Sequence, residues 1–293
     1  MEKVAIYTRY IADDFKHHLV DFFDILHERN VELMVYEPSL PVFYKVLKDH
    51  IPYSTFNSHL DLRDEASFLV SIGGDGTLLD STLLIRDSGI PIVGINTGRL
   101  GFLARISLDE LGNAVDELLN GNFEEEERTL LKLESDSNLF PNKNFALNEL
   151  TIHKKDSTSM VKIHTYVNGE FLNTYWADGL IISTPTGSTA YSLSCGGPIV
   201  YPGSNNFVIT PVAPHNLNVR PIVLPDDCKL SFRVEGRSEQ FLASLDSRTE
   251  VIDASTQLSV VKNDFSIKLL RLHDYSFLKT IRNKMNWGLD IRN

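Results

Sequence analysis

The chain has 293 residues, of which 42% are hydrophobic and 23% charged, with a formal net charge of −11. This length suffices for two domains with a substantial core, and the acidic balance argues against a protein that coats nucleic acid. Cys195 and Cys228 show neither metal-ligand spacing nor a disulfide framework, which is typical of a reducing compartment. The N-terminus lacks a signal peptide's apolar segment, and no apolar run reaches membrane-spanning length. We therefore expect a cytoplasmic protein without membrane or nucleic-acid partners.

The first third of the chain alternates short apolar runs with segments of helical periodicity. Strands are predicted at 4–7, 31–36, 68–72 and 90–95, and helices at 15–26, 40–48 and 107–120. The last of these helices opens with a capping box from Ser107 to Glu110 and ends at Gly121. Because strands that alternate with helices form parallel sheets, we expect a ligand site at the carboxyl ends of the strands.

The periodicity changes after residue 127. Residues 161–167 alternate apolar and polar side chains and lead into Asn168-Gly169, the strongest short signal for a β-hairpin. Further strands are predicted at 130–134, 145–153, 180–183, 207–212, 229–234, 241–245 and 258–272. The second half is therefore expected to be mostly antiparallel β, with a last helix near 275–287.

The predicted fold is an α/β N-terminal domain with a parallel sheet, followed by a β-rich C-terminal domain. We place the first domain at residues 1–125 plus 274–293, with the final helix packed back on it, and the second at 126–273. The four glutamates at 124–127 form the only dense charge run, and we interpret them as a solvated connector.

The sequence Gly73-Gly74-Asp75-Gly76 follows the predicted strand 68–72 and precedes a segment of helical spacing. Backbone N–H groups at such a strand–helix turn can hold a phosphate, and glycine lets a ligand approach without meeting a Cβ atom. A carboxylate repels phosphate, so Asp75 is expected to accept a proton or face a metal ion. The alternative is a tight turn in which Asp75 bonds to its own backbone.

Three other stretches combine polar residues with apolar strands. The loop 96–102 carries glycines at the end of the strand 90–95. The run from Asp178 to Ser192 leads into a loop rich in hydroxyls, which can surround a phosphate or ribose or can hold a turn by its own side chains. Asn148-Glu149 lies inside the predicted strand 145–153, where it can hold a ribose diol or mark a sheet edge.

Together these motifs resemble the ATP-dependent NAD kinases of the bacterial type. The matching stretches, in the family's order and approximate spacing, are 73–76, 96–102, 148–149, 178–198 and 210–221. The resemblance covers essentially the whole chain. The glycine–aspartate motif alone is shared with diacylglycerol kinases, sphingosine kinases and phosphofructokinases, whereas the run after Asp178 is highly specific to NAD kinases.

The resemblance implies roles for the matching residues. Asp75 is the general base on the 2′-hydroxyl of the adenosine ribose, Asn148 and Glu149 hold ribose hydroxyls, and Asp178 recognises the nicotinamide end. The remaining nucleotide-binding residues are Gly73, Gly74, Gly76 and Phe102 around the phosphates and the dinucleotide pocket, Thr186, Gly187 and Ser188 in the hydroxyl-rich loop, and Thr189, Ala190, Tyr191 and Ser194 around the adenine and its ribose. Arg248 is either a further nucleotide contact or a member of a surface ion pair.

The implied reaction is ATP + NAD⁺ giving ADP + NADP⁺ with a divalent cation, expected to be magnesium. The resemblance also implies a homo-oligomer, either a dimer or a tetramer, whose site is completed across subunits. The chain contains neither a Walker motif nor a G-x-G-x-x-G fingerprint. Trp176 and Cys195 stand where many bacterial members have arginine and alanine, which leaves fine contacts open. The competing interpretations are a diacylglycerol-type lipid kinase and a non-catalytic NAD(P) sensor, although a sensor needs no base.

Overall fold

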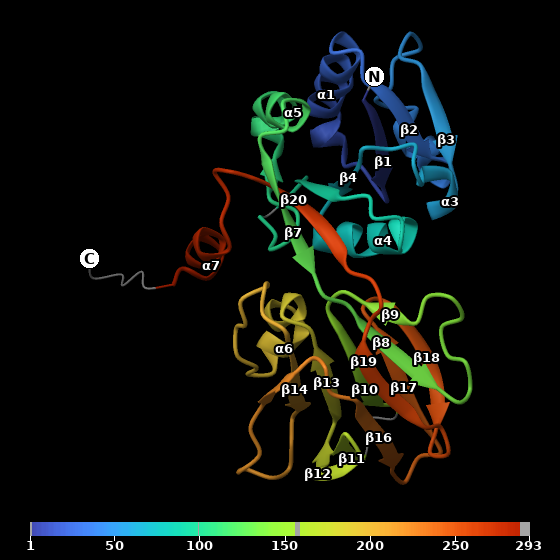
Figure 1. Cartoon of the computed structure of the whole chain (residues 1–293), viewed down its shortest axis with the longest axis vertical. Helices are drawn as coiled ribbons and strands as arrows, with labels where there is room; N and C mark the ends of the chain where they lie inside the picture. Colours follow the sequence, from blue (N-terminus) through green and yellow to red (C-terminus); the bar gives the residue numbers. More distant parts are fainter. Residues whose placement is uncertain (1, 99, 156–158, 288–293) are drawn as a thin grey trace. The chain divides into compact units, whose positions relative to one another are not determined.

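The computed structural model describes residues 2–98, 100–155 and 159–287, and its chain divides into two compact units. One unit consists of Met1–Glu127 together with Ile267–Asn293, and the other of Arg128–Ser266 (Figure 1). The chain therefore leaves the first unit and returns to it. The return lies before the predicted boundary at 273, because the strand Ile267–Leu272 pairs with the sheet of the first unit.

The first unit contains one sheet, in the order β3-β2-β1-β4-β5-β20-β7, with β6 beside β5. The strands are β1 (Lys3–Thr8), β2 (Glu32–Tyr36), β3 (Tyr53–Phe56), β4 (Phe68–Gly73), β5 (Ile92–Asn96), β6 (Ile106–Ser107), β7 (Phe123–Arg128) and β20 (Ile267–Leu272). The pairings from β3 through β20, and that of β6 with β5, are parallel. This confirms the predicted parallel sheet.

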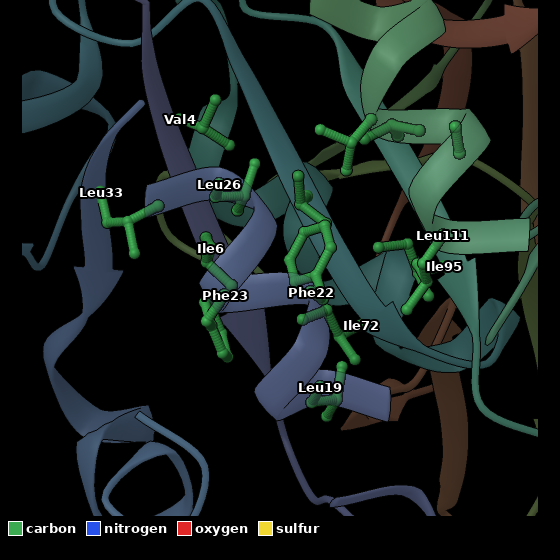
Figure 2. Packing of buried hydrophobic residues seen from close by; sticks show 14 of the residues in the cluster. Val4, Ile6, Leu19, Phe22, Phe23, Leu26, Leu33, Ile72, Ile95 and Leu111 are labelled. Atoms are coloured by element: carbon green, nitrogen blue, oxygen red, sulfur yellow. The ribbon is translucent and has the colours of Figure 1, made fainter. Parts of the chain in front are cut away.

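Helices cover both faces of this sheet. On one face, α1 (Lys16–Glu28) and α5 (Leu111–Leu119) bury apolar side chains against alternate residues of the central strands (Figure 2). On the other face, the Leu78 side chain of α4 (Asp75–Ile85) lies near Gly94 of β5. The remaining helices of the first unit are α2 (Leu40–Phe43), α3 (His59–Leu62) and α7 (Phe277–Met285). Helix α7 buries Phe277 and Ile281, as expected for a final helix that packs on the first domain.

Two predictions for the first unit were wrong. The helix expected at 40–48 is only one turn, α2, preceded by a 3-10 turn. The glutamates at 124–127 do not form a solvated connector but part of the strand β7. Basic residues of β20 compensate their charge: Arg271 contacts Glu124 and Glu126, and Lys268 lies 2.7 Å from Glu125.

The second unit is a sandwich of two six-stranded sheets, ordered β15-β14-β13-β10-β17-β18 and β12-β11-β16-β19-β8-β9. Its elements are β8 (Leu131–Ser135), β9 (Phe145–Ala146), β10 (Glu149–Lys154), β11 (Val161–Val167), β12 (Glu170–Ala177), β13 (Gly179–Ser183), α6 (Tyr191–Ser194), β14 (Asn206–Val212), β15 (Ile222–Pro225), β16 (Leu230–Glu235), β17 (Gln240–Leu245), β18 (Arg248–Asp253) and β19 (Leu258–Lys262). The strand pairs are antiparallel, and both sheets contribute to one apolar core.

The hairpin at Asn168-Gly169 is confirmed, since both residues have positive φ angles between the paired strands β11 and β12. The single strands expected at 145–153 and 258–272 were wrong. The first is divided into β9 and β10, which belong to different sheets, and the second into β19 and β20, which belong to different units. Among the described residues, no helix is long and apolar enough to cross a membrane.

Candidate active site

The glycine–aspartate motif lies at the carboxyl end of β4, where the chain turns directly into α4. Gly73 ends the strand with φ +152°, and a Cβ atom there would lie 2.3 Å from Thr77 Oγ1. Gly74 and Gly76 are exposed, and a Cβ atom at either would meet no heavy atom within 4 Å. The turn therefore presents bare backbone at the N-terminus of an 11-residue helix, as a phosphate site requires.

Asp75 is the first residue of α4, and its carboxylate accepts three backbone hydrogen bonds from the loop that follows β5. Oδ2 accepts the Phe102 N–H at 2.8 Å, and Oδ1 accepts the N–H groups of Leu103 and Ala104, each at 3.0 Å. A Cβ atom at Gly101 would lie 1.9 Å from Asp75 Oδ1, so only glycine permits this approach. The alternative in which Asp75 bonds to its own turn is wrong, because the carboxylate joins the two glycine loops.

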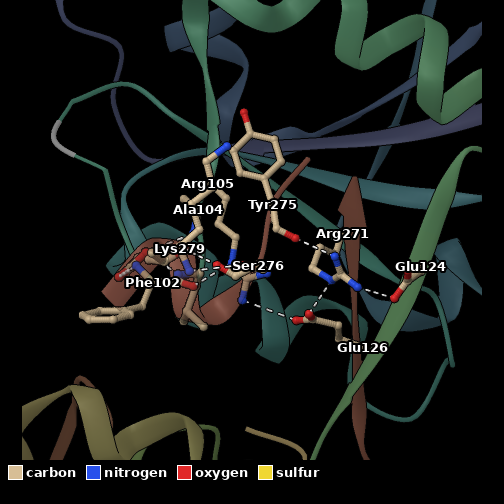
Figure 3. A network of polar contacts seen from close by, with 12 residues as sticks. Phe102, Ala104, Arg105, Glu124, Glu126, Arg271, Tyr275, Ser276 and Lys279 are labelled. Atoms are coloured by element: carbon tan, nitrogen blue, oxygen red, sulfur yellow. Dashed lines mark hydrogen bonds and ion pairs between the residues drawn. The ribbon is translucent and has the colours of Figure 1, made fainter. Parts of the chain in front are cut away.

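Arg105, a buried arginine, is bound to the backbone of this loop (Figure 3). Arg105 Nε donates to the Phe102 carbonyl at 3.0 Å, and its guanidinium lies 3.3 Å from Glu126 of β7. Glu126 in turn lies 2.7 Å from Arg271 of β20. From α7, Lys284 Nζ lies 4.8 Å from the centre of the Phe102 ring. Residues of β7, β20 and α7 thus support the loop whose backbone contacts Asp75. The sequence shows no local signal for Arg105.

The second unit carries the other predicted residues. Asn148 was predicted to lie inside a strand, and this was wrong. It lies in the crossing from β9 to β10. The Thr184 N–H donates to the Asn148 carbonyl at 2.9 Å, and the Thr184 hydroxyl to the Leu147 carbonyl. A Cβ atom at Gly187 would lie 2.1 Å from the Asn148 carbonyl oxygen. The hydroxyl-rich loop after β13 therefore packs directly on the start of β10, as a joint binding surface requires.

Glu149 is the unusual group of this surface. Its side-chain Oε2 is buried and has no hydrogen-bond partner, and the residue is only 9% exposed. Burial, and secondarily the charge of Asp246, raise the pKa of Glu149 to about 8. A buried polar group without a partner is costly and is typical of a site that a ligand completes.

Tyr191 and Cys195 lie near Glu149, whereas Asp178 lies at the opposite end of the β10–β13 strand pair. Asp178 Oδ1 lies 2.5 Å from Lys154 Nζ at the junction of β12 and β13. Burial raises the pKa of Tyr191, and the charges of Asp178 and Glu149 add to this shift. Burial also raises the pKa of the Cys195 thiol, which is therefore no reactive thiolate. Tyr191 therefore lies close enough to both Asp178 and Glu149 to feel their charges.

Two hydroxyls of the hydroxyl-rich loop after β13 form hydrogen bonds with carbonyls of the same loop. The Ser188 hydroxyl donates to the Pro185 carbonyl at 2.7 Å, and the Thr189 hydroxyl to the Thr186 carbonyl at 3.2 Å. These bonds hold the 3-10 turn Thr186–Thr189 and its N-cap residue Pro185, and Thr186, Gly187 and Ser188 are buried in it. By contrast, Ser194 and Tyr191 are exposed on α6. The self-held turn, one of the two alternatives for this segment, is therefore confirmed, and a nucleotide-binding role of the loop stays a prediction.

The Arg248 side chain contacts backbone carbonyls and aromatic rings of its own unit. Its guanidinium donates to the carbonyls of Lys143 and Phe145 and lies 5.8 Å from the centres of the Phe140 and Phe145 rings. These contacts tie the start of β18 to the segment before β10. Its predicted nucleotide contact stays a prediction.

A parallel sheet with a glycine–aspartate turn at a strand end, joined to a β-sandwich with a hydroxyl-rich loop, defines a nucleotide-binding protein with a base suited to group transfer. The profile of the ATP-NAD kinase N-terminal domain matches residues 38–123, and that of the ATP-NAD kinase C-terminal domain matches residues 147–272. The chain belongs to the NAD kinase family. This confirms the resemblance and the expected kinase class, and nothing in the comparisons favours a lipid kinase or a sensor.

Relatives support this assignment over nearly the full length. The NAD kinase of Cytophaga hutchinsonii is 57% identical over 241 residues, which cover 82% of each chain. The NAD kinase of Flavobacterium johnsoniae is 46% identical over 99% of this chain and 100% of its own. Among solved structures, yeast NADH kinase complexed with NADH has a TM-score of 0.88 at 24% identity, covering 100% of this chain and 89% of that one. An NAD kinase from Archaeoglobus fulgidus in complex with ATP has a TM-score of 0.72 at 24% identity and 97% coverage of both chains. These two structures show that the fold is shared.

Proposed function

We propose that the chain transfers the γ-phosphoryl group of ATP to the 2′-hydroxyl of the adenosine ribose of NAD⁺, giving ADP and NADP⁺. The observation that carries this proposal is Asp75, a carboxylate held where two glycine loops meet, in a chain of the NAD kinase family. A sugar hydroxyl is a weak nucleophile, and phosphoryl transfer requires alignment, charge neutralisation and a proton acceptor.

The hydrogen bonds of Asp75 indicate which oxygen takes the proton. Each carboxylate oxygen has about two acceptor sites. Oδ1 already accepts two N–H groups, whereas Oδ2 accepts one. Oδ2 therefore retains a free acceptor position for the hydroxyl proton, while the backbone of Leu103 and Ala104 fixes the direction of the carboxylate. This gives Asp75 both roles, loop anchor and base.

The other predicted site residues are proposed as nucleotide contacts. In the first unit these are Gly73, Gly74, Gly76 and Phe102, and in the second Asn148, Glu149, Asp178, Thr186, Gly187, Ser188, Thr189, Ala190, Tyr191, Ser194 and Arg248. Exposed backbone at Gly74 and Gly76 and the unpartnered Oε2 of Glu149 support the two groups. Because the loop hydroxyls of Ser188 and Thr189 bond internally, we expect the loop to contact the nucleotide mainly through its backbone and α6.

A magnesium ion is proposed to accompany ATP. Among residues 2–98, 100–155 and 159–287, no cluster of three or more His, Cys, Asp or Glu side chains forms a metal site. Magnesium keeps several waters and needs few protein ligands, so the phosphates of ATP would hold most of the ion. When bound, the ion neutralises phosphate charge.

We also propose a homo-oligomer, a dimer or a tetramer, whose second unit supplies most of the interface, and a cytoplasmic location. The family resemblance supports the first of these. The second is supported by Cys195 and Cys228, which are both free thiols, as expected in a reducing compartment.

The deciding experiment is incubation with ATP, Mg²⁺ and NAD⁺, with NADP⁺ read by an NADP-specific dehydrogenase. We expect NADP⁺ formation that depends on all three. A protein that binds NAD⁺ without forming NADP⁺ would be a sensor, and one that phosphorylates diacylglycerol but not NAD⁺ would be a lipid kinase. Either result overturns the proposal.

A further inference from the structure

Asp246 is a partly buried carboxylate that belongs to none of the motifs assigned above. It is the first residue of the two-residue turn between β17 and β18 and has φ +52°. Its Oδ1 accepts the N–H groups of Asn148 and Glu149 at 2.9 and 3.2 Å, and its Oδ2 accepts the Leu147 N–H at 3.0 Å. Its own N–H donates to the Glu149 carbonyl at 3.1 Å.

These contacts complete the hydrogen bonding of the crossing at 147–149. The Asp246 carboxylate accepts hydrogen bonds from the N–H groups of all three residues, and the Asp246 N–H donates to the carbonyl of the third, Glu149. Thr184 donates to the carbonyls of the first two, Leu147 and Asn148. All six backbone polar groups are therefore used by two residues. The direction of the Asn148 and Glu149 side chains follows from this fixed backbone.

We propose that Asp246 is a positioning residue for the nucleotide, which fixes the backbone of Leu147, Asn148 and Glu149 and leaves Glu149 as a neutral hydrogen-bond donor to a ligand oxygen. The proposal rests on the proposed function, in that the ligand is NAD⁺ and the oxygen belongs to a ribose hydroxyl.

Geometry assigns the negative charge of this carboxyl pair to Asp246. Three N–H donors require acceptor oxygens, which an ionised carboxylate supplies. Burial raises the pKa of Asp246, but these donors and the charge of Arg248 oppose the shift. Glu149 has no such donors on Oε2 and faces the Asp246 charge. The other titratable groups that act on this environment are Tyr191 and Cys195, and burial raises the pKa of both. The proton of the pair therefore resides on Glu149.

If Glu149 binds NAD⁺ as a neutral donor, NAD⁺ affinity should decrease at alkaline pH. Ionised Glu149 cannot donate, so affinity should fall as the pH rises through the pKa of about 8 and be about tenfold weaker at pH 9 than at pH 7. Removing the Asp246 charge should make Glu149 easier to ionise and move the break to lower pH. A role of Asp246 in folding alone would weaken binding without moving the break.

The test is NAD⁺ affinity by titration calorimetry from about pH 6.5 to about pH 9.5 for the wild type, Glu149→Gln, Asp246→Asn and Cys195→Ser. We expect a break near pH 8 in the wild type and Cys195→Ser, none in Glu149→Gln, whose amide stays a neutral donor, and a break at lower pH in Asp246→Asn. Asp253→Asn removes an exposed turn carboxylate at the other end of β18 and should keep the wild-type profile.

A flat wild-type profile, an affinity that rises with pH, or an unmoved break in Asp246→Asn would overturn the proposal. If Asp246→Asn does not fold, the wild type and Glu149→Gln still decide whether Glu149 donates. NADP⁺ formation is measured on the same wild-type sample. Its absence refutes the proposed function, whereas NADP⁺ formation with a flat binding profile refutes only the role of Asp246 and Glu149.

Discussion

The Asp75→Asn variant separates the two proposed roles of Asp75, loop anchor and general base. The hydrogen bonds of Asp75 give the loss of kcat expected from the anchor role alone. Asparagine has one carboxamide oxygen, which can keep the bonds to Leu103 and Ala104, and its NH₂ group then faces the Phe102 N–H. One bond to a charged acceptor is lost, which costs about 1.5–3 kcal/mol. If the whole of this cost appeared in turnover, kcat would fall roughly 10- to 100-fold.

Removal of a general base typically costs about 10²–10⁴ in rate. If Asp75 takes the proton, Asp75→Asn should therefore lower kcat by more than the lost bond explains, while NAD⁺ affinity changes only a few-fold. The assay is steady-state NADP⁺ formation, combined with calorimetric titration of NAD⁺ and of ATP–Mg²⁺. A parallel loss of ATP–Mg²⁺ affinity would instead identify Asp75 as a metal-facing group.

Gly101→Ala is the matched control. Its Cβ atom would lie 1.9 Å from Asp75 Oδ1, so the variant disturbs the same contact and keeps the carboxylate. We expect its kcat to fall less than that of Asp75→Asn. Equal losses in the two variants, or a kcat for Asp75→Asn within about tenfold of the wild type, would refute the base mechanism.

Asp178→Ala should weaken NAD⁺ binding about ten- to hundredfold, the equivalent of one charge-assisted hydrogen bond, with little effect on ATP; unchanged NAD⁺ affinity by calorimetry would contradict the nicotinamide assignment. Light scattering at assay concentration should show a homo-oligomer, and an active monomer would remove that proposal. Gly187→Ala places a Cβ atom 2.1 Å from the Asn148 carbonyl oxygen, and such overpacking should cost about 1–3 kcal/mol and lower Tm by several degrees. Gly203→Ala, whose Cβ atom would be 3.7 Å from its nearest neighbour, should leave Tm unchanged; equal melting of the two variants would show that the contact at Gly187 is unimportant.

Structural elements that depend on residues close together in the chain were predictable from the sequence. The strand, glycine turn and helix at 68–85 follow one another within one stretch, and the Asn168-Gly169 hairpin depends on two residues that tolerate positive φ. The alternation of strands and helices was sufficient to predict the parallel sheet.

Features set by distant partners were not predictable. The apolar run 145–153 resembles one strand, and only the Asp246 and Thr184 contacts show where it passes from one sheet to the other. Asp246 is 98 positions from Asn148 in the chain, so no local pattern links them. The same holds for Arg105, whose ion-pair partner Glu126 lies in a glutamate run that resembles a solvated segment.

The position of β20 between β5 and β7 has a consequence for synthesis on the ribosome. β7 is made before the second unit and β20 after it, so β7 lacks its sheet neighbour until almost the whole chain has emerged. During that interval β7, and the part of β5 that does not pair with β6, present open strand edges, which are hazards for aggregation. The glutamates of β7 then have no Arg271 or Lys268 beside them, and their mutual repulsion discourages pairing with another nascent chain. The same charges that stabilise the finished sheet therefore protect the unfinished one.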